Sequence, residues 1–131
     1  MLTDAASTVA DCASLVREFT RERDWEQFHH PKDLGLALAI ETGEVLEHFR
    51  FQTNEEIQAN LADGANRRAL AHELADVFWA LLRLAEVTGV ELAAALDEKV
   101  ALAGEKYPVE ASKGKAGKYT AYQGGEQGLD R

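Results

Sequence analysis

One stretch of this 131-residue chain decides how the rest is interpreted: LALAIETGEVL, residues 36–46. Its apolar residues run through a segment long enough for a buried helix, and the segment has no helix breaker apart from a single glycine. Glu41 and Glu44 interrupt the apolar run three residues apart, so they project from the same side of that helix. Gly43 has no side chain and would let a second helix or a ligand come close.

A second stretch, LAHELADVF at residues 70–78, repeats the arrangement with Glu73 and Asp76. If the two helices pack antiparallel, the two acidic pairs face each other. Carboxylates that converge in a partly dry site repel one another and raise each other's pKa, so they need a compensating cation. Because all-oxygen ligands suit a hard ion, the pattern predicts a site for Mg²⁺ or Mn²⁺.

These carboxylates allow two other interpretations. Acidic pairs at this spacing are common on solvated helix faces, and either pair alone would be read that way. Two pairs, each inside an apolar run and on successive long helices, favour the metal site. A di-iron bundle needs two E-x-x-H motifs, and only Glu26–His29, ahead of Pro31, has that form.

The rest of the sequence predicts an all-α fold of four to five helices, two of them long and antiparallel around the metal site. The first helix is expected to begin at Asp4 with Thr3 as its N-cap, and residues 24–31 are expected to form an ordered loop. Residues 1–108 are predicted to be one domain, and residues 109–131 an irregular tail rich in Gly and Lys. The expected helices start near residues 4, 31, 54, 66 and 91.

Composition narrows the class of protein. The chain has 23 acidic and 14 basic residues, a net charge of −9, which disfavours binding to a nucleic acid polymer. A bound nucleotide would therefore need a cation as intermediary. Cys12 is the only cysteine and cannot form an internal disulfide, which fits a cytoplasmic protein. No apolar run approaches the roughly 20 residues of a membrane helix, so no membrane partner is expected.

Further segments occur in a specific order around the acidic pairs. They are RERDWEQFH at 21–29, Pro31-Lys32, Glu41-x-x-Glu44, ELADV at 73–77, Lys99, KYP at 106–108 and KYT at 118–120. In this order the chain resembles the MazG-type all-α nucleoside triphosphate pyrophosphatases, and most of all their dCTP pyrophosphatase subgroup, over about residues 13–122.

The resemblance implies hydrolysis of a (deoxy)nucleoside triphosphate between its α and β phosphates, giving the monophosphate and pyrophosphate. The substrate implied is dCTP or a modified dCTP, in a nucleotide-pool house-cleaning role. The implied ligands of Mg²⁺, or of Mn²⁺, are Glu41, Glu44, Glu73 and Asp76. Either Glu41 or Glu44 could also be the general base, and the sequence leaves that choice open. Lys99 is implied to contact a phosphate oxygen.

The substrate-binding residues that the resemblance implies are Trp25, Phe28, His29, Phe51, Lys99, Lys118 and Tyr119. The aromatic residues would stack on the base, although Trp25 and Phe28 could equally fill the core, and the lysines could simply be solvated. The chain departs from the subgroup at Phe51, Ala80 and Ala103, where relatives tend to have tryptophan, tyrosine and asparagine. The last two changes remove hydrogen-bonding groups, so we expect less sharp discrimination among bases.

The apolar residues on the predicted helices exceed what a lone small bundle can bury, which favours a homodimer. The resemblance implies a homotetramer. Two alternatives stay open at this point: a nucleotide-binding module with little catalysis, and a helical oligomerisation module with solvated acidic residues. Pyrophosphate release from a panel of nucleotides would separate the three.

Overall fold

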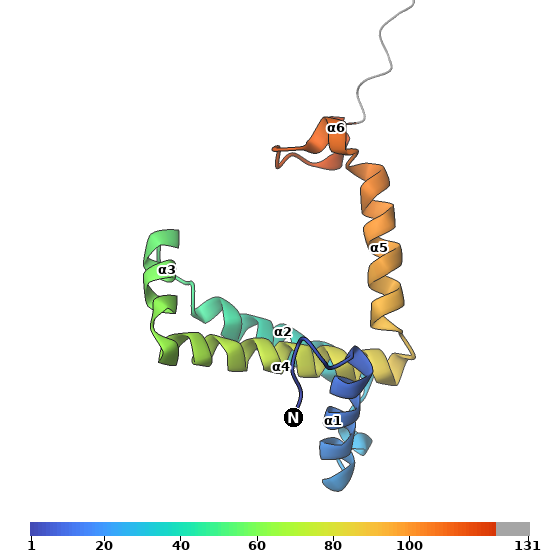
Figure 1. The fold of residues 1–131 in the computed structure, drawn as a ribbon. Coiled ribbons are helices and arrows are strands. Elements are labelled where there is room, and N and C mark those ends of the chain that lie inside the picture. Colours follow the sequence, from blue (N-terminus) through green and yellow to red (C-terminus); the bar gives the residue numbers. More distant parts are fainter. Residues whose placement is uncertain (123–131) are drawn as a thin grey trace, which may run out of the picture. The chain divides into compact units, whose positions relative to one another are not determined.

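A computed structural model describes residues 1–122 of the chain, and this part is helical without a strand (Figure 1). The all-α prediction is therefore confirmed. The elements, in chain order, are α1 (Val9–Glu22), η1 (Glu26–Phe28), α2 (Pro31–Glu47), α3 (Asn54–Ala62), α4 (Gly64–Thr88), α5 (Leu92–Lys106), α6 (Val109–Ser112) and η2 (Tyr119–Tyr122), where η denotes a short 3₁₀ helix.

Helix α1 begins five residues later than expected, at Val9. Its N-cap is Thr8, whose hydroxyl accepts the Asp11 N–H at 3.1 Å while the Asp11 carboxylate accepts the Thr8 N–H at 2.7 Å. This reciprocal capping box satisfies two backbone groups, whereas Thr3 closes only a turn ahead of it. The expected start at Asp4 is thus wrong.

Local sequence signals set the ends of the long helices. Pro31 occupies the first turn of α2, where its missing N–H costs no hydrogen bond. The Asp63 side chain accepts N–H bonds at the start of α4, from Ala65 at 2.8 Å and Asn66 at 3.2 Å, so this helix begins two residues earlier than predicted. Gly89, with φ of 71°, ends it in the left-handed conformation that glycine accepts without strain.

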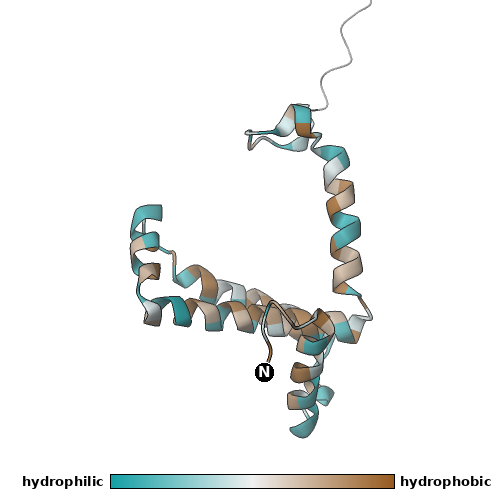
Figure 2. Cartoon of the chain, viewed as in Figure 1, coloured by the Kyte–Doolittle hydropathy of each residue, from teal (hydrophilic) through white to brown (hydrophobic). Residues whose placement is uncertain are grey.

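The contacts within the chain divide it into two compact units, and the first spans Met1–Val90. Here α2 lies antiparallel beside α4, while α1 and α3 also pack on α4 (Figure 1). Figure 2 shows hydrophilic residues on the first turns of α4 and hydrophobic residues farther along it. The core of this unit is small, and its buried apolar residues are Val16, Leu34, Ala80, Leu82 and Ala85.

The second unit, Glu91–Arg131, contains α5, α6 and η2 and is described up to Tyr122. The ring of Tyr107 meets the rings of Tyr119 and Tyr122 edge-on, and the Gly117 N–H donates to the Tyr122 hydroxyl at 2.8 Å. These contacts give local order to a segment expected to be irregular. The domain boundary after residue 108 stays a prediction, and residues 123–131 of the expected tail lie outside the described residues.

Residues 24–31, expected to form an ordered loop, contain the 3₁₀ turn η1 at Glu26–Phe28. No helix in residues 1–122 combines the length and the hydropathy needed to cross a membrane.

Candidate active site

Three carboxylates converge where α2 faces α4. Glu41 comes from α2, and Glu73 and Asp76 come from successive turns of α4. One oxygen from each lies within 4.8 Å of the others. Glu41 and Glu73 are half-buried, so water screens their mutual repulsion only in part. The antiparallel packing expected from the sequence therefore brings residues of both acidic motifs together.

The electrostatics of the cluster centre on Glu41. Burial raises the pKa of its carboxyl, and the charges of Asp76, Glu73 and Glu44 raise that pKa further, in that order. Glu44 is exposed and stands outside the group of three, yet its charge acts on Glu41. All four residues singled out in the sequence thus interact, although only three share one point of convergence.

The donor set fits a hard divalent cation. Every candidate ligand is a carboxylate oxygen, and neither histidine nor cysteine enters the group. Oxygen-only sites suit Mg²⁺ or Mn²⁺ rather than zinc or iron. A cation between α2 and α4 would neutralise the repulsion that raises the pKa of Glu41. Metal binding by the four carboxylates of the two acidic motifs stays a prediction.

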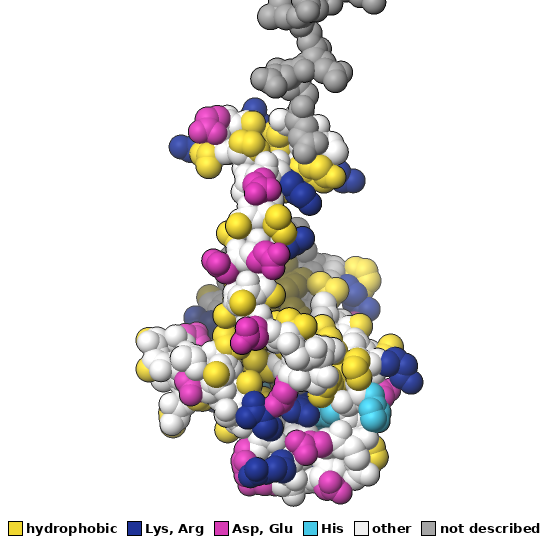
Figure 3. Space-filling model, turned by 90° about the vertical axis from the view of Figure 1, so that its right-hand side faces the viewer, with side chains coloured by type: hydrophobic (Ala, Val, Ile, Leu, Met, Phe, Trp, Pro, Cys, Tyr) yellow, Lys and Arg dark blue, Asp and Glu magenta, His cyan; other side chains and the backbone are white. Residues whose placement is uncertain are grey.

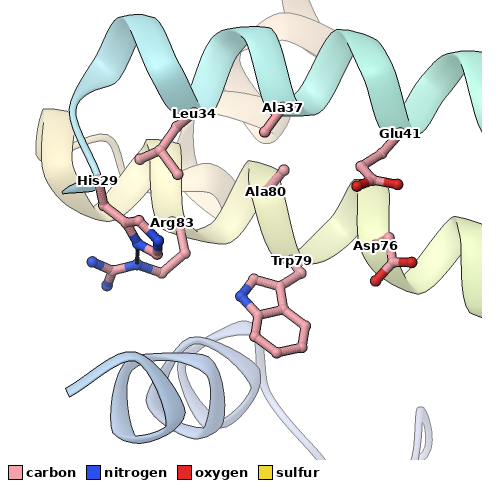
Figure 4. Close-up of a pocket in the computed structure, with 8 residues that line it drawn as sticks. All are labelled: His29, Leu34, Ala37, Glu41, Asp76, Trp79, Ala80 and Arg83. Atoms are coloured by element: carbon pink, nitrogen blue, oxygen red, sulfur yellow. Dashed lines mark hydrogen bonds between the residues drawn. The ribbon is translucent and has the colours of Figure 1, made fainter. Parts of the chain in front are cut away.

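A pocket of about 270 Å³ extends from the acidic cluster along the groove between α2 and α4 (Figure 4). Glu41 and Asp76 form one end of it. In its middle the methyl groups of Ala37 and Ala80 point toward each other across the groove, and their small size leaves the space open. The residues that line the pocket are His29, Leu34, Ala37, Glu41, Asp76, Trp79, Ala80 and Arg83.

A polar network forms the end of the pocket opposite the carboxylates. Arg83 is only 4% exposed, and its Nε–H donates to Nδ1 of His29 at 3.1 Å. The same guanidinium pairs with Glu86, which also pairs with Arg17 of α1. Burial lowers the pKa of His29, the positive charge of Arg83 lowers it further, and Glu26 opposes both. His29 is therefore held neutral at physiological pH.

The other residues predicted to bind substrate lie outside this pocket. Trp25 packs its ring edge-on against Phe19, with 5.8 Å between ring centroids, and stays 45% exposed. Phe28 is 62% exposed, and Phe51, with a φ of 61°, is 95% exposed. None of the three lines the pocket next to the carboxylates, and their contact with a base stays a prediction.

Lys99, Lys118 and Tyr119 belong to the second unit. Lys99 lies on α5, and Tyr119 receives the Lys106 ammonium over its ring at 5.3 Å from the centroid. The roles of these three residues toward phosphate stay predictions.

Sequence reasoning missed Arg83 and Trp79 as pocket residues. A single arginine among apolar helix residues is usually solvated, and a tryptophan in the same helix suggests core packing. One feature of the sequence pointed to Arg83 as a pocket residue. It lies three residues after Ala80, and both project from the side of α4 that also carries Asp76.

The chain is similar to known proteins in sequence and in fold. The sequence profile of the MazG-like family matches residues 36–121, which include both acidic motifs and α5. The chain belongs to the MazG-like family. A pyrophosphatase from Archaeoglobus fulgidus, known from a crystal structure, superposes on it with a TM-score of 0.72 and 28% sequence identity, covering 82% of this chain and 99% of that one.

Within this family the curated relatives include dCTP pyrophosphatase 1 of rat, 42% identical over 113 residues, and that of human, 39% identical over 113 residues. Both alignments cover 86% of this chain and 66% of the relative. The chain thus spans about two thirds of the length of the relatives that it matches. The resemblance drawn from the sequence motifs is confirmed at the level of the family.

Proposed function

We propose that this chain hydrolyses a deoxynucleoside triphosphate between the α and β phosphates, in a reaction that depends on Mg²⁺. The products are a nucleoside monophosphate and pyrophosphate. The observation that supports this most directly is the convergence of Glu41, Glu73 and Asp76 from two facing helices, in a chain of the MazG-like family.

Under this proposal each part of the groove has a task. The three converging carboxylates, with Glu44 beside them, would hold Mg²⁺, and Mn²⁺ is the natural substitute. A cation bound there supplies charge neutralisation for the phosphates and a more acidic water. The protein itself positions the triphosphate and excludes competing orientations. The pocket beside the carboxylates offers room for the nucleoside part.

For the base we propose cytosine, as dCTP or a modified dCTP. The support is the similarity to proteins named dCTP pyrophosphatase 1, at about 40% identity. Such a hydrolase removes unwanted nucleotides from the pool, so we place it in the cytoplasm with a nucleoside triphosphate as its partner, and with neither a nucleic acid polymer nor a membrane.

We also propose a homodimer or a homotetramer. Large apolar side chains lie exposed on both α2 and α4, among them Ile40 at 64%, Leu36 at 56% and Leu74 at 51%. On α5, Leu96 and Val100 are also more than 60% exposed. Figure 3 shows hydrophobic side chains reaching the surface in several places. Exposed apolar surface of this kind is typical of interfaces, so further copies of the chain would cover it.

The test is pyrophosphate release from dCTP, dUTP, dTTP, dATP and dGTP, each with and without Mg²⁺. We expect turnover only with the metal, and its near loss in Glu73→Gln and Asp76→Asn. Glu55→Gln, an exposed carboxylate on α3, is the matched control and should keep wild-type turnover.

Each alternative predicts a different result in this assay. Binding of nucleotide without pyrophosphate release would indicate a nucleotide-binding module. No binding and no release would indicate a helical oligomerisation module, and either outcome would reject the proposed hydrolysis. Light scattering on the same samples measures the oligomeric state, and a monomer at micromolar concentration would contradict the proposed assembly.

A further inference from the structure

The end of the pocket farthest from the carboxylates carries hydrogen-bond donors. The imidazole of His29 lines this end beside the buried Arg83, and the indole of Trp79 lies between this end and Asp76 (Figure 4). Pockets for small molecules are mostly apolar, and a few placed polar groups fix the orientation of the ligand. The middle of this pocket is apolar, so these donors are the groups available for that role.

The bond from Arg83 fixes which nitrogen of His29 carries the proton. The guanidinium can only donate, so Nδ1 must accept with its lone pair at 3.1 Å. The proton of the neutral ring then sits on Nε2, which becomes a donor. In Figure 4 this second ring nitrogen lies on the side of the imidazole toward Trp79 and Ala80. Arg83 therefore turns His29 into a donor that faces the pocket.

The position of Arg83 is itself fixed. Its guanidinium pairs with Glu86, and Glu86 is held from the other side by Arg17 of α1. At 4% exposure and with this ion pair, the arginine side chain is held in place. The network joins α1, α4 and the segment before α2, so the orientation of His29 is set by three parts of the first unit.

Trp79 supplies a second donor. Its ring is anchored against Phe19 at 4.9 Å between centroids and an interplanar angle of 89°. Figure 4 shows the indole nitrogen on the edge toward His29 and Arg83. Among the side-chain hydrogen bonds within residues 1–122 none uses this N–H, and it is not a buried unpaired group, so it is open to the pocket that Trp79 lines. An N–H left open at the wall of a pocket is suited to an acceptor on a ligand.

The spacing fits a nucleotide. Asp76 and Arg83 are separated by seven residues on α4, which corresponds to about 10 Å along the helix. A nucleotide whose phosphates lie at the carboxylates would pass its sugar and base between Ala37 and Ala80. The far edge of the base would then meet the donors.

We propose that Arg83 is a positioning residue that holds His29, already expected to bind substrate, in the tautomer whose Nε2–H can donate to an acceptor of a pyrimidine base. This inference rests on the proposed function and extends it to the base. Cytosine has two neighbouring acceptors, O2 and N3, which match the two donors His29 and Trp79. Uracil and thymine keep O2 but replace the N3 acceptor with a donor, so they would retain one of the two bonds.

The first experiment measures binding of dCMP by calorimetry in the presence of Mg²⁺, which requires no turnover. We expect His29→Phe, which keeps a ring and deletes both nitrogens, to weaken binding about five- to tenfold, the typical effect of one neutral hydrogen bond. His29→Gln retains a donor near the position of Nε2 and should bind within about threefold of wild type. His30→Phe, at the exposed neighbouring histidine, is the matched control and should leave dCMP binding unchanged.

The second experiment tests Arg83 through the state of His29. Correlation spectra of ¹⁵N-labelled imidazoles distinguish the two tautomers in the ligand-free protein. Wild type should show the Nε2–H form, whereas Arg83→Met should show a mixture and a pKa of His29 shifted upward, because a positive charge is lost. In Arg83→Met the charge that still acts directly on the His29 ring is that of Glu26, and the Glu86–Arg17 ion pair remains nearby. Arg83→Lys keeps a charge but loses the fork of donors, and exposed Arg67→Met is the control.

The outcomes separate this inference from the proposed function. Equal dCMP affinity in wild type and His29→Phe, or no dCMP binding by wild type at millimolar concentration, would overturn the role of His29. An unchanged tautomer in both Arg83 variants would overturn the role of Arg83. Absence of pyrophosphate release from every nucleotide, with the binding and tautomer results as expected, would instead reject the hydrolysis alone.

Discussion

Replacing Glu41 by Gln should change stability in opposite directions with and without Mg²⁺. In the metal-free protein Glu41 is repelled by its neighbours and partly desolvated, and both effects raise its pKa. A carboxyl whose pKa is raised in the folded state destabilises that state once it ionises. Removing the charge while keeping the shape should therefore stabilise the metal-free protein at neutral pH.

The magnitude follows from the geometry of the cluster. Two unit charges at 4.8 Å, the distance within which these oxygens lie, repel by about 0.9 kcal/mol at the dielectric constant of water, and Glu41 has two such neighbours in Glu73 and Asp76. Screening at about 0.1 M salt reduces the sum to roughly 1 kcal/mol. For a chain of this size that is a rise of roughly 3–6 °C in Tm. With Mg²⁺ at a hundred times its Kd, wild type should gain about 2.7 kcal/mol, most of which the variant should lose.

Thermal unfolding in EDTA and in millimolar Mg²⁺, between pH 4 and pH 8, measures both effects. The metal-free advantage of Glu41→Gln should be absent at acid pH, where the glutamate is already protonated in both states. It should grow as the pH rises through the folded-state pKa of Glu41. Glu55→Gln on α3 should show neither effect. If Glu41→Gln lowers the metal-free Tm at pH 7, or if wild type does not respond to Mg²⁺, the carboxylates do not form a cation site.

Three further predictions concern other parts of the molecule. Glu44→Gln should nearly abolish pyrophosphate release while leaving the far-ultraviolet circular dichroism unchanged, and wild-type turnover at saturating Mg²⁺ would remove Glu44 from the site. Thr8→Ala should cost about 1 kcal/mol in urea unfolding, because it removes the N-cap of α1; a loss below about 0.3 kcal/mol would show that the capping box contributes little. The kcat/KM ratio of dCTP to dUTP or dTTP should stay below about a thousandfold, roughly 4 kcal/mol of discrimination, and a larger ratio would show a more selective pocket.

The elements that place the carboxylates could be predicted because their signals are local. Pro31 at the start of α2, Gly89 after α4 and the apolar runs between them act within a few residues of the chain. The prediction that the two motifs face each other needed only antiparallel packing of successive long helices. The start predicted for α1 was wrong because Thr3 has no acidic residue three positions later, whereas Thr8, the actual N-cap, is followed by Asp11 at that spacing.

The pocket could not be predicted in the same way, because it depends on which side chains meet across the groove. Ala37 and Ala80 are ordinary helix formers in the sequence, and only their opposition in space makes them the open middle of a cavity. The contact between His29 and Arg83 joins residues 54 positions apart. No periodicity or spacing rule connects them, since the partner of a buried polar group is fixed by tertiary packing.

The position of Arg83 changes the interpretation of Ala80, which stands where relatives tend to have tyrosine. From the sequence, alanine at this position removed a polar group and left only stacking to recognise a base. In the structure the methyl group of Ala80 opens the groove, and a polar group returns one turn later through Arg83, which acts on His29. A small residue and a buried arginine together can thus replace one larger polar side chain. Base recognition in this chain then depends on a hydrogen bond whose donor is set by a second residue, so substitutions at position 83 should alter affinity for the base without altering the carboxylates that face the phosphates.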